Sequence, residues 1–444
     1  MNDPTRAPFP WTGWFRSAFI RRVLFGLGIG SAGALAGQPQ APPPAPALKP
    51  VRPGKAPPNP YSKALVARGK LLVVSSGCND CHTPWHIDPE LGAPAPDWTR
   101  MLSGHPEGGP DPQGEIGPGD IGLIGPTFTS FKLPFGITYS INLTPDIDTG
   151  TGTWTEKMFL DVFRKGRHLG GDGRPVYPPM PWDSYRFRSD EDLRAMFAYL
   201  RSVPPLRNLP PTEKVPPPVE GAIIEMNQKI IALQANPNAK LAPPKNGPPP
   251  PPPLPLRPVV RGTAPGRSYP AEMIRRGKVI VMAGACNHCH TPWVYDPVLG
   301  APAPDWTRLL SGHPEGAPDP QGKPGPHDIA LIGPTFTSFR LPFGIVYSKN
   351  LTPDVETGSG GWTEEKFVAI FRTARHPDGR VLLPPMPWDM VRILPDSDLR
   401  AVFAYLQSVP PIRNEVPDSK VPPEAQKMLE GVNAKMLLHP PGPH

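Results

Sequence analysis

Two short stretches decide the fold prediction for this chain: Cys78-Asn79-Asp80-Cys81-His82 and Cys286-Asn287-His288-Cys289-His290. Each is a C-x-x-C-H motif, the spacing typical of covalent c-type haem attachment. Two thiols three positions apart on one helical turn can form thioethers to one porphyrin, and the next residue, a histidine, then lies below the ring as proximal iron ligand. The motifs contain all four cysteines of the 444-residue chain, so we expect two covalently bound haems c.

Three other uses of paired cysteines fit this sequence less well. A zinc ribbon also combines two C-x-x-C elements, but its pairs are usually tens of residues apart, whereas these motifs begin 208 positions apart, at 78 and 286. A thioredoxin-type redox pair would lie in a βαβ pattern, and neither motif has one around it. Structural disulfides would not require a histidine directly after each pair. Haem attachment is therefore the favoured interpretation.

Length and composition limit the class of protein. A chain of this length predicts two or three domains. It contains 73 prolines, about three times the usual share of ~5%, so much of it should be linker or wrapped loop. The net charge is +7, of which residues 1–36 contribute +3 (four arginines against one aspartate). No clustered Lys/Arg tract is present, so we expect no nucleic-acid partner.

The N-terminus has the pattern of an export signal. Arginines precede a short apolar run at residues 23–36, which ends in Ala34-Leu35-Ala36, an A-x-A-like cleavage site. As a helix this run would span about 21 Å, which is too short for a hydrocarbon core of ~30 Å. We therefore predict a cleaved signal peptide and a periplasmic protein; the alternative is an uncleaved anchor that tethers the protein to the membrane.

The chain repeats itself. Residues 91–100 (LGAPAPDWTR) recur letter for letter at 299–308, and residues 178–183 recur at 384–389. The offset changes from 208 to 206 positions between these matches, so one two-residue deletion separates the halves. We predict a duplicated domain with these segments: signal peptide 1–36, Pro-rich tether 37–59, first domain 60–217, linker 218–267, second domain 268–423 and tail 424–444.

Helical patterns dominate each half. An apolar face at residues 61–76 runs directly into Cys78, and helices with polar caps are indicated at residues 154–163 and 189–200. Residues 83–146 have no helical or strand period, yet they are rich in aromatic side chains, which suggests loops packed on an apolar surface. We therefore predict an all-α fold, with two helical domains that carry long irregular loops.

The predicted linker has two parts. Residues 222–233 suggest a short helix. Residues 245–258 form a polyproline tract, which should be a semi-rigid spacer of ~3.1 Å per residue. Such a spacer would keep the two domains electrically distinct.

A second axial ligand should occupy equivalent positions in both halves. Among the twelve methionines, only Met180 and Met386 are equivalent under the repeat, each within Pro-Pro-Met-Pro-Trp. The flanking prolines fix the local backbone and would hold the thioether toward the ring. The alternative role for this methionine is core packing. The predicted iron ligands are therefore the pairs His82/Met180 and His290/Met386.

Histidine is the rival sixth ligand. His105 and His313 recur under the repeat within Ser-Gly-His-Pro-Glu-Gly, which predicts a surface turn. His168 and His376 also recur, and they could reach a haem propionate or solvent. The remaining histidines in the body of the chain have no counterpart in the other half, so we treat them as incidental: His86, His288 and His327.

With C-x-x-C-H, N-L-T-P-D and P-P-M-P-W in register, both halves resemble class I c-type cytochromes. They look most like the haem domains in cytochrome subunits of periplasmic alcohol and related dehydrogenases. The resemblance covers both repeats but not the signal, linker or tail, and it implies two tandem cytochrome c domains joined by the Pro-rich linker. It also implies that the glycine of the first helix lies against the last helix, which pairs Gly69 with Tyr199 and Gly277 with Tyr405.

Electron transfer is the function that these features favour. Two six-coordinate irons would leave no open position for a substrate, and His/Met ligation raises the reduction potential. We expect a carrier between redox proteins such as a dehydrogenase, the bc1 level or an oxidase, not an enzyme in itself. The alternative is a dihaem peroxidase with a ligand-switching haem. The related dehydrogenase subunits typically carry three haems, and this chain has two, which leaves the redox partner open.

Overall fold

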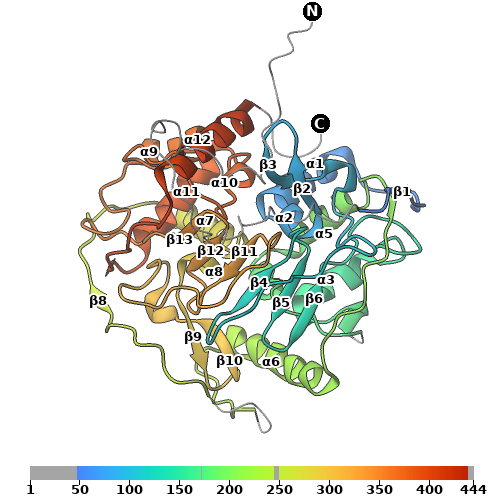
Figure 1. The fold of residues 1–444 in the computed structure, drawn as a ribbon, viewed down its shortest axis with the longest axis horizontal. Helices are drawn as coiled ribbons and strands as arrows, with labels where there is room; N and C mark the ends of the chain where they lie inside the picture. Colours follow the sequence, from blue (N-terminus) through green and yellow to red (C-terminus); the bar gives the residue numbers. More distant parts are fainter. Residues whose placement is uncertain (1–47, 172, 245–249, 439–444) are drawn as a thin grey trace, which may run out of the picture.

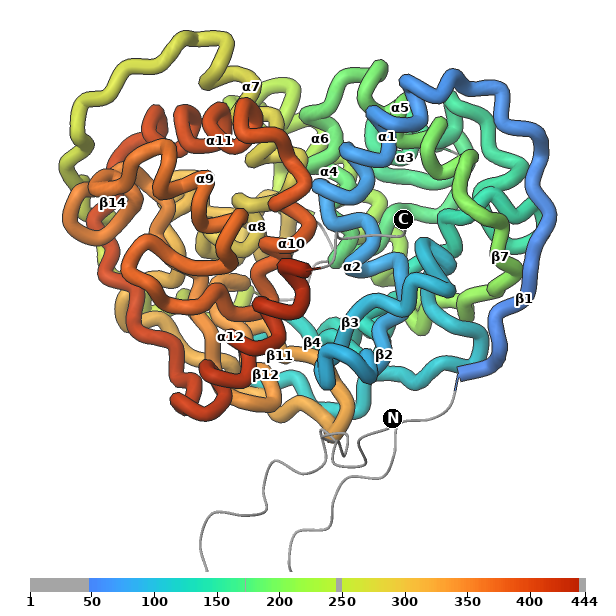
Figure 2. The backbone as a smooth tube through the Cα atoms, turned by 90° about the horizontal axis from the view of Figure 1, so that it is seen from above, coloured from blue at the N-terminus to red at the C-terminus, as the bar shows by residue number. Residues whose placement is uncertain are grey.

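The computed structural model describes residues 48–171, 173–244 and 250–438. The predicted signal peptide lies outside the described residues, as do parts of the tether, the polyproline tract and the tail. The two halves of the chain form lobes that lie side by side, coloured blue to green and yellow to red (Figures 1 and 2). Within the described ranges, no helix has the length and apolar character needed to cross a bilayer.

The two halves contain corresponding helices. Those of the first half are α1 Lys63–Ser75, α2 Cys78–His82, α3 Glu156–Lys165, α4 Trp182–Tyr185, α5 Asp190–Leu200 and α6 Pro217–Ala235. Those of the second half are α7 Ala271–Ala283, α8 Cys286–His290, α9 Glu364–Thr373, α10 Trp388–Val391, α11 Asp396–Ser408 and α12 Pro423–Leu438.

Side-chain caps begin three helices of the first half. Ser62, Thr155 and Ser189 each accept a hydrogen bond from a backbone N–H three residues further on. Such caps satisfy backbone donors that a helix leaves unpaired at its first turn. The predicted cap at Ser189 is thus confirmed, and Thr155 is the cap of α3.

The first and last helices of each predicted domain cross closely, as expected. A Cβ atom added at Gly69 of α1 would overlap the carbonyl oxygen of Ala195 and lie 2.8 Å from Cβ of Tyr199 on α5. The second half repeats this contact, with an added Cβ at Gly277 only 2.9 Å from Cβ of Tyr405. A helix-interior glycine costs about 1 kcal/mol of stability relative to alanine, and the close packing that it permits offsets this cost.

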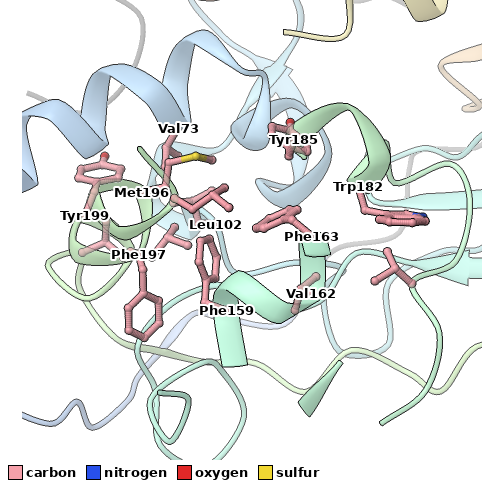
Figure 3. Close-up of a cluster of buried hydrophobic side chains, with 14 of the residues drawn as sticks. Val73, Leu102, Phe159, Val162, Phe163, Trp182, Tyr185, Met196, Phe197 and Tyr199 are labelled. Carbon is pink, nitrogen blue, oxygen red and sulfur yellow. The ribbon is translucent and has the colours of Figure 1, made fainter. Parts of the chain in front are cut away.

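A core of buried apolar side chains fills the space beneath this crossing (Figure 3). Val73 comes from α1, Phe159 and Phe163 come from α3, and Met196 and Phe197 come from α5. The rings of Phe159 and Phe163 meet edge-on at 5.2 Å between centroids, a favoured aromatic geometry. The helices of each half therefore pack as the apolar pattern predicted.

The prediction of an all-α fold is wrong. The loop that we expected to be irregular forms strands, and these build a six-stranded antiparallel sheet at the centre of Figure 1, in the order β13-β12-β11-β4-β5-β6. Its strands are β4 Gly122–Ile124, β5 Ser130–Leu133, β6 Gly136–Tyr139, β11 Ala330–Ile332, β12 Ser338–Leu341 and β13 Gly344–Tyr347. The fold is therefore mixed α and β. The sequence pattern did not indicate these strands because segments of only three or four residues are too short to show a two-residue period.

Four small antiparallel pairs complete the strands of the described residues. Two of them are hairpins, β2 Trp85–Asp88 with β3 Ala93–Pro96 and β9 Trp293–Asp296 with β10 Ala301–Pro304. The other two join distant segments, β1 Arg52–Pro53 with β7 Leu206–Arg207 and β8 Val260–Arg261 with β14 Ile412–Arg413. In each half, the second kind of pair joins the segment before the first helix to the segment that follows α5 or α11.

The sheet also joins the two halves, which are therefore not helical bundles connected only by a linker. β4 pairs with β11, with Leu123 opposite Leu331 at the middle of the register. Both leucines are fully buried. The Asp120 carboxylate accepts hydrogen bonds from backbone N–H groups of residues 321 and 322, and Asp328 accepts them from residues 113 and 114. Charge-assisted bonds of this kind are stronger than neutral ones.

Two further helices cover the lobes. α6 contains the predicted short helix at residues 222–233 but is longer, and α12 begins one residue before the predicted tail and runs through most of it. They pack alike, because Asn227 donates to the carbonyl of Val176 while Asn433 donates to that of Leu382, the corresponding residue. Apolar residues of α6 face the interior, including the buried Ile223. The boundaries of the two domains themselves stay a prediction.

Replacing Gly69 with alanine should destabilise the protein by roughly 2 kcal/mol or more, because the added methyl group overlaps a helix backbone. Gly221 is the matched control, since it lies in α6 and an added Cβ meets no atom within 4 Å. Gly221→Ala should leave stability unchanged or raise it by up to about 1 kcal/mol. Chemical denaturation measures both, and equal effects of the two substitutions would contradict the close crossing.

Candidate haem-binding cavity

A large cavity is lined by residues of both halves. Its volume is about 2660 Å³, well above the roughly 300–1,000 Å³ of a pocket for one small ligand. The structure brings every predicted site residue to its wall: Cys78, Cys81, His82, Met180, Cys286, Cys289, His290 and Met386. The cavity thus has room for more than one large group. Both predicted sites therefore lie on the wall of the same cavity.

The sheet forms the wall nearest to both motifs. Apolar side chains of β4, β5, β11 and β12 pack with Cys81 and Cys289 in one cluster. Among them, Phe131 and Phe339 are buried and line the cavity. The second cysteines of the two motifs therefore approach each other across the same apolar wall.

The four cysteines are not joined in disulfides. Burial raises the pKa of the Cys78 and Cys286 thiols to about 11, and that of Cys289 to about 12. These shifts favour the protonated thiol at neutral pH. Among the described residues, no group of three or more His, Cys, Asp and Glu side chains is arranged to hold a metal ion. Free, protonated thiols at this spacing do suit thioether attachment.

Both motif histidines are oriented by the backbone. His82 Nδ1 lies 2.9 Å from the carbonyl oxygen of Ile141, and His290 Nδ1 lies 2.8 Å from that of Lys349. Because a carbonyl only accepts, Nδ1 must carry the proton, which leaves the Nε2 lone pair free. Burial lowers the pKa of His82 to about 4 and also lowers that of His290. Each imidazole is therefore neutral near pH 7, the form that binds a metal.

Both methionines sit on rigid turns at the cavity wall. The backbone N–H of Met180 donates to Tyr177, and its carbonyl accepts from Trp182 at 2.9 Å. Met386 makes the equivalent bonds to Leu383 and Trp388. Each methionine is partly buried against the core of its own half. Packing and iron ligation are both compatible with this position, so the ligand role stays a prediction.

The prediction that His105 and His313 lie in surface turns is wrong. Their exposed fractions are 0% and 1%. Each Nδ1 lies 2.9 Å from a threonine hydroxyl, and each ring packs on a tyrosine, with centroids 4.9 Å apart for His105 and Tyr139. Neither histidine is among the residues that line the cavity. Their position offers no exchange ligand for an iron in the cavity.

His168 and His376, in contrast, do line the cavity. Burial lowers the pKa of His168 to about 3, and its ring meets Trp154 edge-on at 5.8 Å. Arg174 also lines the wall and forms a 2.7 Å ion pair with Glu213. The expectation that these histidines reach a propionate or solvent stays a prediction.

Known proteins with similar sequences point to one class. No model of a protein family matches the chain. It is 25% identical over 356 residues to the cytochrome c subunit of the quinone alcohol dehydrogenase of Gluconobacter oxydans, covering 79% of this chain and 56% of that subunit. It is also 25% identical over 348 residues to a diheme cytochrome c-type protein of Cereibacter sphaeroides, covering 78% of this chain and 86% of that protein.

The chain resembles a dihaem c-type cytochrome. It resembles in particular the cytochrome subunits of dehydrogenases. A shorter match, 33% identical over 178 residues, is to one of the subunits of the nicotinate dehydrogenase of Pseudomonas putida, covering 39% of this chain and 12% of that relative. The chain thus spans about half the length, or less, of the first dehydrogenase relatives.

Acid should destabilise this protein through the buried His105 and His313. Burial lowers the pKa of each to about 4 from an ordinary value near 6.5, so each contributes stability above pH 6.5 that is lost as the pH falls from about 6.5 to about 4. The double variant H105Q/H313Q should therefore lose less stability over this window, by roughly 1–3 kcal/mol per histidine.

Thermal unfolding between pH 4 and pH 7.5 measures this difference. His86 lies exposed on β2, so H86Q is the control and should unfold with the same pH dependence as the natural protein. Parallel pH profiles for H105Q/H313Q and the natural protein would show that neither buried imidazole resists protonation.

Proposed function

We propose that this chain is an exported dihaem c-type cytochrome that carries electrons between redox partners in the periplasm or at the membrane. The observation that carries the proposal is the single cavity on whose wall both C-x-x-C-H motifs and both repeat-related methionines meet. The likeness to cytochrome subunits of dehydrogenases supports it.

The residues present fit two covalently held haems. Cys78 and Cys81 would bind the first group, and Cys286 and Cys289 the second. The corresponding axial ligands would be His82 with Met180 and His290 with Met386. When bound, haem supplies reversible one-electron chemistry. The free thiols, the unprotonated Nε2 atoms and the apolar wall are the features of this chain that favour this assignment.

The chain's own residues would set the conditions for electron transfer. Backbone carbonyls of Ile141 and Lys349 hold the proximal imidazoles in one orientation, which would keep each Nε2 available to iron. The buried apolar side chains exclude water and lower the local dielectric. Because both sites share a cavity, no folded domain stands between them. Such an arrangement suits rapid internal transfer of single electrons.

The peroxidase alternative receives less support. A peroxidase of this kind needs an iron with an open or exchangeable sixth position. His105 and His313 were the candidates for such an exchange, and both are hydrogen-bonded behind the cavity wall. With His/Met ligation at both sites, a carrier is the simpler function.

The redox partners and the cellular location of this protein are inferred from the same likeness to dehydrogenase cytochrome subunits. The relatives' names make a dehydrogenase the first candidate partner, with the bc1 level or an oxidase as the electron acceptor. Export would bring the motifs to the compartment in which haem c is attached. Residues 1–36 would act as the signal, or as a membrane tether if they are retained.

Removing one cysteine pair should halve the covalent haem. In C78A/C81A the first thioether site is lost, while the second pair is unchanged. The pyridine-haem content per protein should fall to about half, and C286A/C289A should give the same result. An unchanged haem-to-protein ratio in either variant would refute the assignment of that motif.

Replacing a methionine ligand should lower one reduction potential. Imidazole favours the ferric state more than a thioether does, so M180H and M386H should each lower the midpoint potential of one haem by roughly 0.1–0.3 V, within the wide range that axial ligands set. The other potential should move less. Met158 does not line the cavity, so M158H is the matched control and should move neither potential.

Potentiometric titration, with a peroxide assay on the same samples, distinguishes the two functions. A carrier should reduce peroxide slowly in the natural form. Rapid peroxide reduction by the natural protein, or unchanged potentials in both histidine variants, would favour the peroxidase over the carrier.

A further inference from the structure

Three side chains next to Cys78 form a polar group inside the first half. Ser76 ends α1, two residues before the motif, and its hydroxyl accepts a 2.6 Å hydrogen bond from Arg188. The Tyr185 hydroxyl donates to the Ser76 carbonyl at 2.8 Å. Tyr185 is 3% exposed and Arg188 is 5% exposed. Tyr185 and Ser76 line the cavity, so the group lies directly behind the wall at the first haem site.

The second half lacks this group. The residues at the corresponding positions, offset by 208 or 206, are Gly284, Val391 and Leu394. All three line the cavity, and none bears a charge. The two sites therefore match in cysteines, histidine and methionine, yet differ in what stands beside the first cysteine.

The charge on Arg188 is not neutralised by an ion pair. A guanidinium stays protonated in proteins, and among the described residues no carboxylate forms an ion pair with it. The nearby Asp192 pairs with Arg68 instead. Arg188 Nε has no hydrogen-bond partner at all. A buried, unpaired positive charge acts over a long range because little water screens it.

Three other basic residues on the cavity wall have acidic partners. Arg174 pairs with Glu213, and Arg380 pairs with Asp378 at 2.6 Å. Lys349 replaces Ile141 in the second half, but its side chain is 27% exposed and lies 3.9 Å from the carboxylate of Asp418. Solvent and this partner weaken its effect.

The motifs themselves differ at one interior position, which is Asp80 in the first and His288 in the second. Asp80 is partly buried and His288 is buried within its motif helix. Neither of these groups belongs to the polar group behind Cys78. Arg188 is the charged member of that group, and an apolar leucine occupies its place in the second half.

We propose that Arg188, held by Ser76 beside Cys78, raises the midpoint potential of the haem at Cys78/Cys81 above that of the haem at Cys286/Cys289. A fixed positive charge disfavours the ferric state, which carries one more positive charge than the ferrous state. One electron would then pass from the second site to the first, with no proton gained or lost by Arg188. The proposal rests on the proposed function and gives it a direction: electrons enter at the C-terminal site and leave from the N-terminal one.

Potentiometric titration of the holoprotein tests this inference. The natural protein should show two one-electron waves. R188L places the second half's residue in the first half. In this variant the midpoint potential of the upper wave should fall by about 59 mV, which corresponds to about a tenfold change in the one-electron equilibrium constant. R188K, which keeps the charge, should retain most of the upper potential, and K349I should shift the lower wave by less than R188L shifts the upper one.

Two further variants cover the case in which R188L folds poorly. R188Q removes the charge but keeps a donor for Ser76, and it should also lower the upper wave. The triple variant G284S/V391Y/L394R transfers the polar group to the second half, and it should raise the lower wave. A purely structural role for Arg188 would lower thermal stability in R188L and R188Q without moving a wave.

Several results would overturn the proposal. These are two coincident waves in the natural protein, unmoved waves in both R188L and R188Q, or a shift confined to the lower wave. The pyridine-haem content of the same samples separates this failure from that of the proposed function. Two haems per chain with unmoved waves would reject only the role of Arg188, whereas fewer than two would reject the dihaem assignment.

Discussion

The antiparallel pairing of β4 with β11 is the contact on which the rest of the structure depends. It is only three residues long, but it joins two three-stranded sheets into one and buries Leu123 and Leu331 at its centre. Asp120 and Asp328 strengthen it, because each carboxylate accepts backbone hydrogen bonds from the opposite half. Without this pairing the cavity between the halves would lose its apolar wall and open to water.

Enclosure of the cavity explains the electrostatics of its wall. Burial raises the pKa of the Cys78 and Cys286 thiols and lowers the pKa of the His82 and His290 imidazoles, and a neutral imidazole is the form that binds iron. The same low dielectric makes any remaining charge effective over a longer distance. Some charged groups at the wall are paired with a group of opposite charge, whereas Arg188, which lies behind the wall, has no ion-pair partner among the described residues. A duplicated site can thus acquire two different potentials through a few side chains behind the wall.

The sequence predicted the helices and the site better than the sheet. A C-x-x-C-H motif and the glycine–tyrosine crossing at Gly69 and Tyr199 are local or repeated signals, and the structure brings their residues together as expected. β4 and β11 lie more than two hundred positions apart, and strands of three residues carry no periodic signal, so an all-α fold was predicted instead. His105 was misplaced for a similar reason: glycine and proline indicate its turn, but the strands β5 and β6 that bury it were not predicted.

The location of the two irons tests most directly whether both haems bind in the cavity between the halves. Anomalous diffraction at the iron edge, from crystals of the holoprotein, would place each iron relative to the chain. We expect two anomalous peaks inside the cavity between the halves. The first should lie beside His82 Nε2 and Met180, and the second beside His290 Nε2 and Met386. A single peak, or an iron outside this cavity or away from either motif histidine, would contradict it.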